Sequence, residues 1–364
     1  MKNITLQVSL FFALLLVACQ PTSTQPIFAP SVDATATSIP LPSTEPKTVA
    51  TLPGVIWSFD ISSDLNAIAF ATSKGLAVYD FNDYEHLHTL EENENVFSLA
   101  WSPDGKQLAA SIIQGIDELH GEVILKIWDA ATWKVVFQPT FGEDLINERI
   151  LDIAWSPDGM KLAVSTDVHG VMVLDLKSGE IISHQTEFAS SVQEISWSPD
   201  GSRLVSTGDM AYSLRRWKVS DDESVRLYDQ RVSNPWYVAW SPDGERIASG
   251  HVLGATCLWT VVTNKCDGFI QAHRSAVFSL AWSPDSQQLA TGGGVIRIWD
   301  TLTGKLITAF GENEEYIYVH LVWGSDEGPI ITLESGLENP GDTRVRFWDI
   351  DTGTPLVEFQ GGER

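Results

Sequence analysis

The chain has 364 residues, and its apolar content of 43% is sufficient for a core of ordinary size. It carries 23 Lys and Arg against 48 Asp and Glu, a formal net charge of −25, which disfavours attraction to nucleic acid or to anionic membrane surfaces. The 14 Trp, 27 Gly and 17 Pro favour many short strands joined by turns.

Residues 1–18 are predicted to be a lipoprotein signal peptide. Lys2 precedes an apolar run that is too short to span a bilayer and that ends in Leu16-Val17-Ala18-Cys19. This ending resembles the bacterial lipobox, and the resemblance implies that Cys19 is lipidated. The protein would then be held on a cell membrane by this lipid only, facing outside the cytoplasm. Ordinary secretory cleavage nearby is the alternative.

Residues 19–52 are predicted to be a disordered tether, because Pro, Ser and Thr dominate and large apolar residues are scarce. The remaining chain, 53–364, is predicted to be one folded body. Lys47 to Leu52 and Pro355 to Gln360 both resemble the outermost strand of its last sheet. The C-terminal segment is favoured, because it follows Asp351-Thr352-Gly353 at the spacing found in the other repeats.

One unit is repeated seven times along this body. Trp-Ser-Pro-Asp-Gly begins at Trp101, Trp155, Trp197 and Trp240, Trp-Ser-Pro-Asp-Ser begins at Trp282, and degenerate copies begin at Ile61 and Trp323. We call these seven positions the repeat-turn residues. A second series marks the end of each third strand: Tyr79, Trp128, Leu174, Trp217, Trp259, Trp299 and Trp348. A period of about 40 residues with Trp-Asp endings indicates propeller blades.

Each unit divides into four strands by alternation of apolar residues and by turn chemistry. The sixth unit predicts strands at 277–282, 288–291, 295–300 and 305–310. Pro and Gly in Ser-Pro-Asp-Gly favour a type I turn between the first two strands. The predicted fold is therefore all-β, a seven-bladed propeller of four-stranded antiparallel blades.

The Trp-Ser-Pro-Asp-Gly turns and Trp-Asp strand ends resemble those of the WD-repeat β-propeller family. The resemblance implies a rigid ring that binds proteins or peptides. Two departures stand out: the family's Gly-His survives only as Ala272-His273, and no loop Asp in that blade is placed to pair with the His. The blades are therefore expected to be held chiefly by Trp packing.

Three loops are longer than their counterparts, at 108–128, 128–155 and 330–348. All lie at one end of the ring, where second-to-third and fourth-to-first connections meet; we call this end the long-loop face. Its loops carry many acidic residues: Glu91, Glu92, Glu94, Asp117, Glu118, Glu122, Glu143, Asp144, Glu148, Glu312, Glu314, Glu315, Glu334, Glu338 and Asp342. They indicate either a cationic partner or a solubilising surface.

Aromatic residues also recur at this end. The seven residues four positions before the repeat-turn residues are Trp57, Phe97, Leu151, Gln193, Trp236, Phe278 and Val319. They are either partner-binding anchors at the mouth of the ring or core between blades. The candidate partner-binding set is Trp57, Phe97, Trp236, Tyr237, Phe278, Glu118, Glu122, Glu143, Asp144, Glu314, Glu315 and Glu338.

The usual hydrolase and nucleotide-binding motifs are absent from the sequence, so no enzyme activity, cofactor or metal is predicted. Cys257 and Cys266 lie on adjacent strands with a diagonal offset. Free packed thiols are favoured over a disulfide, because the offset is long for a bridge.

The leading hypothesis is a non-enzymatic, lipid-anchored extracytoplasmic scaffold that binds a protein or peptide at the long-loop face. One alternative is an enzyme or small-ligand or cation binder of lactonase-like type, using Asp60, Asp152 and Glu194 at the centre of the ring. Another is a TolB-like envelope accessory.

Overall fold

The computed structural model describes residues 45–117, 120–139, 149–186, 191–208, 214–311, 315–325 and 328–362, with only the backbone for 115–117, 120 and 121. The predicted signal peptide, Cys19 and most of the predicted tether lie outside these ranges. Within them, no helical segment has the length and hydrophobicity needed to cross a bilayer.

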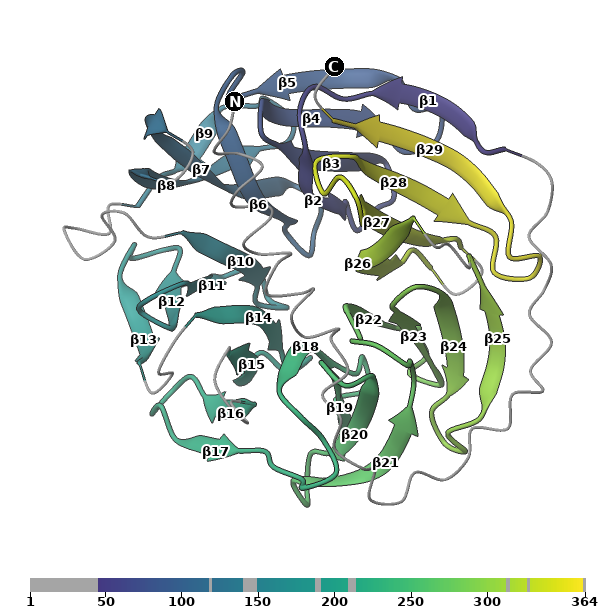
Figure 1. Cartoon of the computed structure of the whole chain (residues 1–364). Coiled ribbons are helices and arrows are strands. Elements are labelled where there is room, and N and C mark those ends of the chain that lie inside the picture. Colours follow the sequence, from purple (N-terminus) through teal and green to yellow (C-terminus); the bar gives the residue numbers. More distant parts are fainter. Residues whose placement is uncertain are drawn as a thin grey trace.

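The described strands form seven sheets arranged as blades round one axis, so the predicted all-β seven-bladed propeller is confirmed (Figure 1). Each blade is a meander of four antiparallel strands, and its first strand lies nearest the axis. First strands of successive blades contact each other around the ring. A meander of this kind exposes two apolar faces, and stacking the blades in a circle covers both.

Four consecutive strands of the chain make up each blade. Blades 1 and 2 contain β2 (Ile56–Ile61), β3 (Ala67–Thr72), β4 (Gly75–Asp80), β5 (His86–Leu90), β6 (Asn95–Trp101), β7 (Gln107–Asp117), β8 (His120–Asp129) and β9 (Val135–Phe137). Blades 3 and 4 contain β10 (Ile150–Trp155), β11 (Lys161–Thr166), β12 (Val171–Asp175), β13 (Ile181–Gln185), β14 (Val192–Trp197), β15 (Arg203–Gly208), β16 (Arg215–Lys218) and β17 (Ser224–Arg226). Blades 5 and 6 contain β18 (Pro235–Trp240), β19 (Arg246–His251), β20 (Ala255–Thr260), β21 (Lys265–Gln271), β22 (Ser279–Trp282), β23 (Gln288–Gly292), β24 (Ile296–Asp300) and β25 (Leu306–Phe310). Blade 7 contains β26 (Tyr316–Trp323), β27 (Ile330–Gly336), β28 (Thr343–Trp348) and β29 (Pro355–Gly361), and β1 (Lys47–Thr51) lies beside it.

The repeated turn is held by its own side chains. In blade 2, Gly105 donates its backbone N–H to the carbonyl of Ser102 at 2.9 Å and has φ +68°, which a glycine adopts without strain. The Ser102 hydroxyl donates to Asp104 at 2.7 Å and accepts the backbone N–H of Gln107 at 2.9 Å. The motif therefore specifies a turn, and its aspartate is used locally.

The core lies between blades. Each neighbouring pair of blades shares one cluster of buried apolar side chains. Several repeat-turn tryptophans also bond to the preceding blade: the indole N–H groups of Trp155, Trp197 and Trp282 donate to the carbonyls of Ala100, Ala154 and Ala239, at 3.0 to 3.1 Å. The expected role of Trp in joining blades is confirmed for these residues.

Blade 6 nevertheless contains a buried hydrogen-bond chain. The indole of Trp299 donates to the Thr291 hydroxyl at 2.9 Å, and Nε2 of His273 lies 2.8 Å from the same oxygen. Nδ1 of His273 faces the Arg297 guanidinium at 3.0 Å, so Nδ1 must accept and Nε2 must carry the proton. Burial, then Arg297, lower the pKa of His273 to about 3. A Trp299–Thr291–His273 hydrogen-bond chain is thus present in blade 6, and it ends at Arg297.

The ring is closed by both ends of the chain. The C-terminal strand β29 pairs antiparallel with β28 as the fourth strand of blade 7, which confirms the favoured prediction. The N-terminal strand β1 then adds to β29 in parallel as a fifth strand, at the outer edge of the ring (Figure 1). Leu52, 1% exposed, follows in the core between blades 7 and 1. The predicted tether boundary at residue 52 is therefore wrong, and the folded body begins at about Lys47.

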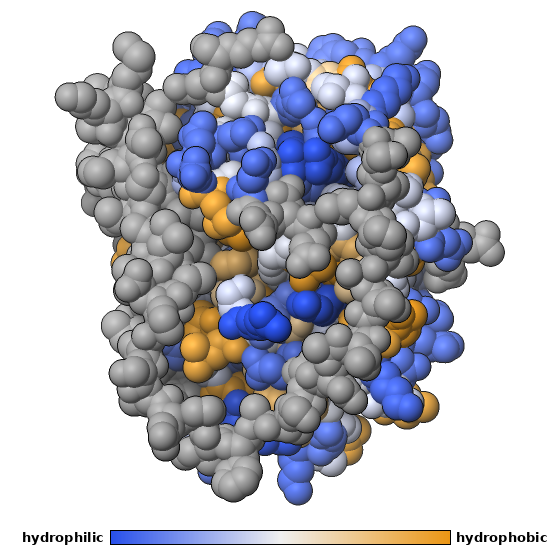
Figure 2. Space-filling view, turned by 45° about the vertical axis from the view of Figure 1, so that its right-hand side comes forward, coloured by the Kyte–Doolittle hydropathy of each residue, from blue (hydrophilic) through white to orange (hydrophobic). Residues whose placement is uncertain are grey.

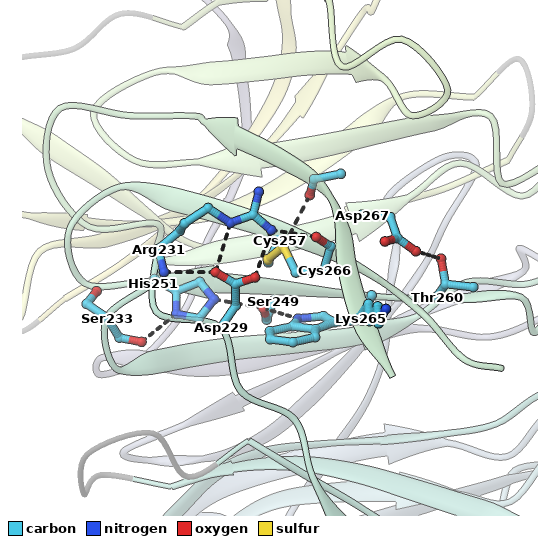
Figure 3. The surroundings of a disulfide bond; sticks show 12 residues. Asp229, Arg231, Ser233, Ser249, His251, Cys257, Thr260, Lys265, Cys266 and Asp267 are labelled. Carbon is cyan, nitrogen blue, oxygen red and sulfur yellow. Dashed lines mark hydrogen bonds and ion pairs between the residues drawn. A yellow bond between two sulfur atoms is a disulfide. The ribbon is translucent and has the colours of Figure 1, made fainter. Parts of the chain in front are cut away.

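A disulfide joins Cys257 of β20 to Cys266 of β21 in blade 5, contrary to the favoured free thiols (Figure 3). The predicted diagonal offset is correct, because Cys266 pairs with Trp259. A bulge between Leu258 and Trp259 shortens the diagonal and leaves the two Cα atoms 5.7 Å apart, within the normal range for a bridge. The Arg231 guanidinium donates to the carbonyl of Cys266 at 2.6 Å.

Candidate interaction site at the long-loop face

The long-loop face is extended by a protruding hairpin. The expected long loop in blade 2 is instead a continuation of β7 and β8, which remain paired as far as Asp117 and His120. In blade 7 the connection between β27 and β28 spans 337–342. These features project from a rigid ring, the arrangement in which binding loops are commonly found.

Several predicted acidic residues are at the surface. Glu122, Glu315 and Glu338 are exposed, whereas Glu118, Glu143, Asp144 and Glu314 lie outside the described residues. Glu91 is not free, because its carboxylate forms a 2.8 Å ion pair with Lys126. Figure 2 shows one side of the molecule, on which hydrophilic residues alternate with smaller apolar patches.

Glu334 does not belong to this acidic surface, and its assignment there is wrong. It lies within β27, 0% exposed, and accepts from the Arg344 guanidinium at 2.7 Å. Arg346 lies 3.7 Å from the same oxygen, and the Thr332 hydroxyl donates to the other carboxylate oxygen at 3.1 Å. The residue falls in the strand because β27 and β28 remain paired as far as Ser335 and Thr343, which sets Glu334 directly opposite Arg344.

The predicted aromatic positions share an unforeseen geometry. In six of the seven innermost strands the pairing with the second strand is interrupted by a β-bulge at the residue four before the repeat-turn residue. In blade 6 the equivalent residue, Phe278, directly precedes β22. A bulge leaves one residue unpaired and redirects its side chain. We call these residues the collar: Trp57, Phe97, Leu151, Gln193, Trp236, Phe278 and Val319.

Six members of the collar are half-buried, and Phe278 is 5% exposed. The rings of Trp57 and Phe97 lie 5.7 Å apart across blades 1 and 2, and those of Trp236 and Phe278 lie 6.0 Å apart across blades 5 and 6. Phe278 packs with Ile317 in a small core cluster, so its assignment as a partner-binding residue is wrong. Trp57, Phe97 and Trp236 retain the exposed surface that a contact needs.

Each collar residue is followed in the sequence by a polar residue. The positions after the bulge are Ser58, Ser98, Asp152, Glu194, Tyr237, Ser279 and His320. The Tyr237 hydroxyl donates to the carbonyl of Val319 at 2.6 Å, linking blade 5 to blade 7. Tyr237, predicted as an exposed anchor, is therefore a half-buried residue that joins two blades. Burial lowers the pKa of His320 to about 4, so this imidazole is neutral at pH 7.

Asp60, Asp152 and Glu194 form what we call the axial carboxylates. Asp60 accepts the backbone N–H of Trp101 in the next blade at 2.7 Å, and Asp152 accepts that of Ile195 at 2.9 Å. Burial raises the pKa of Asp60 and of Asp152 to about 6. Burial, then repulsion by Asp152, raise the pKa of Glu194 well above its usual range. The three groups are half-buried and interact electrostatically.

The axial carboxylates are not arranged as a metal-binding site. Among the described residues, no three His, Cys, Asp or Glu side chains lie close enough to hold a metal ion. None of the ion pairs within the described ranges includes Asp60, Asp152 or Glu194. The site therefore presents three half-buried carboxyl groups that have no ion-pair partner among the described residues.

The bulges could have been found from the sequence. Buried positions of a regular strand recur every two residues, yet Ile56 and Phe59, Val96 and Leu99 or Ile150 and Ile153 are three apart. This spacing, repeated from blade to blade, indicates an inserted residue.

Comparison with protein-family models places repeats in several parts of the chain. The model of the WD domain, G-beta repeat matches residues 84–116, 179–229 and 264–300. The model of the anaphase-promoting complex subunit 4 WD40 domain matches residues 120–200. No curated protein sequence matches the chain significantly. Together with the seven-bladed fold, these matches support a WD-repeat propeller.

Proposed function

We propose that this WD-repeat propeller is a non-enzymatic scaffold that binds a protein or peptide partner at its long-loop face. The observation that carries the proposal is the collar, because Trp57, Phe97 and Trp236 keep accessible aromatic surface on a rigid ring. Aromatic side chains of this kind are the usual anchors of protein interfaces. WD-repeat propellers in general bind protein partners, which supports the same function.

We further propose that the scaffold is lipid-anchored through Cys19 and works outside the cytoplasm. The lipobox-like Leu16-Val17-Ala18-Cys19 supports the anchor. The Cys257–Cys266 disulfide is compatible with this location, because such bridges persist in oxidising compartments. Metabolic labelling with a fatty acid tests the anchor: the wild type should incorporate label and a Cys19→Ala variant should not.

Site-specific photo-cross-linking in intact cells tests the binding face. A photoreactive residue is placed at Trp57 or Glu338 on the long-loop face, and at Met160 on the opposite end as the matched control. Met160 is 64% exposed, so accessibility does not limit it. Discrete protein adducts from the first two positions, and none from Met160, would support the proposal. Adducts from Met160 alone, or from no position, would contradict it.

A further inference from the structure

The chain enters the propeller at the end opposite the long-loop face. We call this end the short-turn face, because it carries the first-to-second and third-to-fourth turns of the blades. The third-to-fourth turn of blade 7, at 349–354, lies there and leads into β29. Strand β1 runs parallel to β29, with Lys47 beside Val357. Glu45, which precedes β1, therefore lies on the side of the short-turn face.

This entry point favours one orientation of the ring under the proposed lipid anchor. Residues 20–44 separate Cys19 from Glu45. A flexible chain of that length has its ends about 25–30 Å apart on average. A six-residue strand such as β2 is about 20 Å long. Bringing the long-loop face to the bilayer would use most of that reach to pass back along the outside of the ring, so the shorter route places the short-turn face next to the lipid.

The short-turn face also carries the two most exposed large apolar side chains among the described residues. Val262 is 89% exposed at the tip of the turn between β20 and β21 in blade 5, and Leu302 is 84% exposed at the corresponding tip in blade 6. Ile307 and Leu356, near the starts of β25 and β29, are exposed as well. Figure 1 shows β21, β25 and β29 as the outer strands of consecutive blades, with β1 outside β29. The apolar tips therefore lie on the two blades that precede the one where the chain enters.

The charge of these two turns suits a lipid surface. The turn 260–265 contains Lys265 and no carboxylate, and the turn 300–305 balances Lys305 against Asp300. Carboxylates outnumber lysines in the third-to-fourth turns at 80–85, 175–180, 218–223 and 349–354. A lysine can lay its stem along apolar surface and keep its ammonium group at the level of the lipid phosphates. Asp243 and Asp285 on the neighbouring repeat turns still add negative charge, so an uncharged bilayer surface fits better than an anionic one.

We propose that the propeller stands on the bilayer with the edge of its short-turn face formed by blades 5 to 7, and that Val262 and Leu302 enter the headgroup region. The inference rests on the proposed lipid anchor at Cys19 and specifies which protein surface meets the lipid. A lipid anchor holds a protein near the membrane, and exposed apolar side chains beside the anchor add a second contact that fixes the orientation. The long-loop face then points away from the bilayer, which leaves the collar free for a protein partner.

The test uses the full chain, purified with its lipid anchor and inserted into phosphatidylcholine vesicles. The substitutions Val262→Cys and Leu302→Cys each supply a thiol for the fluorophore NBD, and Leu253→Cys is the matched control. Leu253 is 65% exposed and lies in the same blade as Val262, in the second-to-third loop at the long-loop face. Cys257 and Cys266 are bridged, and a lipidated Cys19 has no free thiol, so the label is specific.

Spin-labelled phosphatidylcholine quenches NBD only at short range and so reports contact with the lipid. Apolar groups held at the interface lie about 5–10 Å into the boundary between headgroups and acyl chains, so NBD at positions 262 and 302 should lose at least about half of its emission, and NBD at position 253 less than about a tenth. Equal quenching at positions 253 and 262, or none at 262 and 302, would overturn the proposal. Brightening at position 262 without quenching would mean that a second copy or another protein covers the tip, and would overturn it as well.

Matched charge variants show whether the apolar tips make the contact. In the Val262→Cys background, Leu302→Asp should reduce the quenching at least about 2-fold, because interfacial binding scales with the apolar area buried, whereas Leu253→Asp should leave it unchanged. Both side chains are largely exposed, so neither change should disturb the fold, and the melting temperature checks this. Equal effects of the two aspartate changes would refute a contact through the tips.

Failure of this inference can be told apart from failure of the anchor. If the wild type floats with the vesicles and Cys19→Ala does not, the anchor stands, and equal quenching at positions 253 and 262 then removes the orientation alone. A wild type that does not float removes both.

Discussion

The buried glutamate of blade 7 allows a quantitative test of how the fold is held together. Glu334 is 0% exposed and lies 2.7 Å from Arg344 and 3.7 Å from Arg346, whose side chains are each 12% exposed. Burial raises the pKa of Glu334 even though both arginines lower it, so water is largely removed from this site. Arg346 also pairs with Glu358 at 2.6 Å, but among the described residues Arg344 has no second carboxylate within ion-pair distance.

A Glu334→Gln substitution keeps the shape and removes the charge, which leaves the Arg344 guanidinium buried without its partner. Breaking one side of a buried ion pair costs about 3–5 kcal/mol, and the amide oxygen still accepts one hydrogen bond, so a loss of about 3 kcal/mol is expected. The matched control is Glu338→Gln, an exposed residue four positions later, which should stay within about 0.5 kcal/mol of the wild type.

Urea denaturation, monitored by tryptophan fluorescence, gives the free energy of unfolding of both variants. Urea is preferred as the denaturant because it leaves the ionic strength unchanged. The double variant Glu334→Gln/Arg344→Met should be less destabilised than the sum of its single changes, because it leaves no unpaired charge. A Glu334→Gln protein as stable as the Glu338→Gln control would refute the buried network, and additive losses would refute its coupling.

Three further outcomes are expected. Replacing Cys257 and Cys266 by alanine should lower the free energy of unfolding by about 2–3 kcal/mol, the chain-entropy value for a loop of nine residues, and should abolish any effect of reductant on the urea midpoint. A chain beginning at Leu52 should melt several degrees below one beginning at Glu45, because only the latter retains β1; equal melting temperatures would contradict a structural role for that strand. Folding raises the pKa of the Asp152 carboxyl group from 3.8 to about 6, so the folded state binds this proton more tightly than the unfolded state does. The stability that the bound proton contributes is complete below about pH 4 and is lost as the pH rises through 6. The stability of Asp152→Asn relative to the wild type should therefore rise by up to about 3 kcal/mol between pH 4 and pH 7.5, and a flat or falling difference would exclude the raised pKa.

The sequence by itself determined the number of blades, the strand order within each and the turns between the first two strands. These features depend on residues close in the chain: the Ser102–Asp104 hydrogen bond closes a turn whatever surrounds it, and alternation marks a strand with two covered faces. The sixth blade illustrates this, since its four strands agree with the predicted ranges to within two residues at each end.

Only the tertiary structure decided features that depend on non-local register. Nothing within Lys47–Thr51 indicates that it pairs in parallel with β29, about 310 residues away, and the bulge that brings Cys257 to Cys266 shifts pairing by a single residue. The same holds for Glu334, which resembles a loop carboxylate until two arginines of the adjacent strand surround it. Local propensities fix which segments are strands, but burial and charge pairing depend on what lies across the sheet and in the next blade.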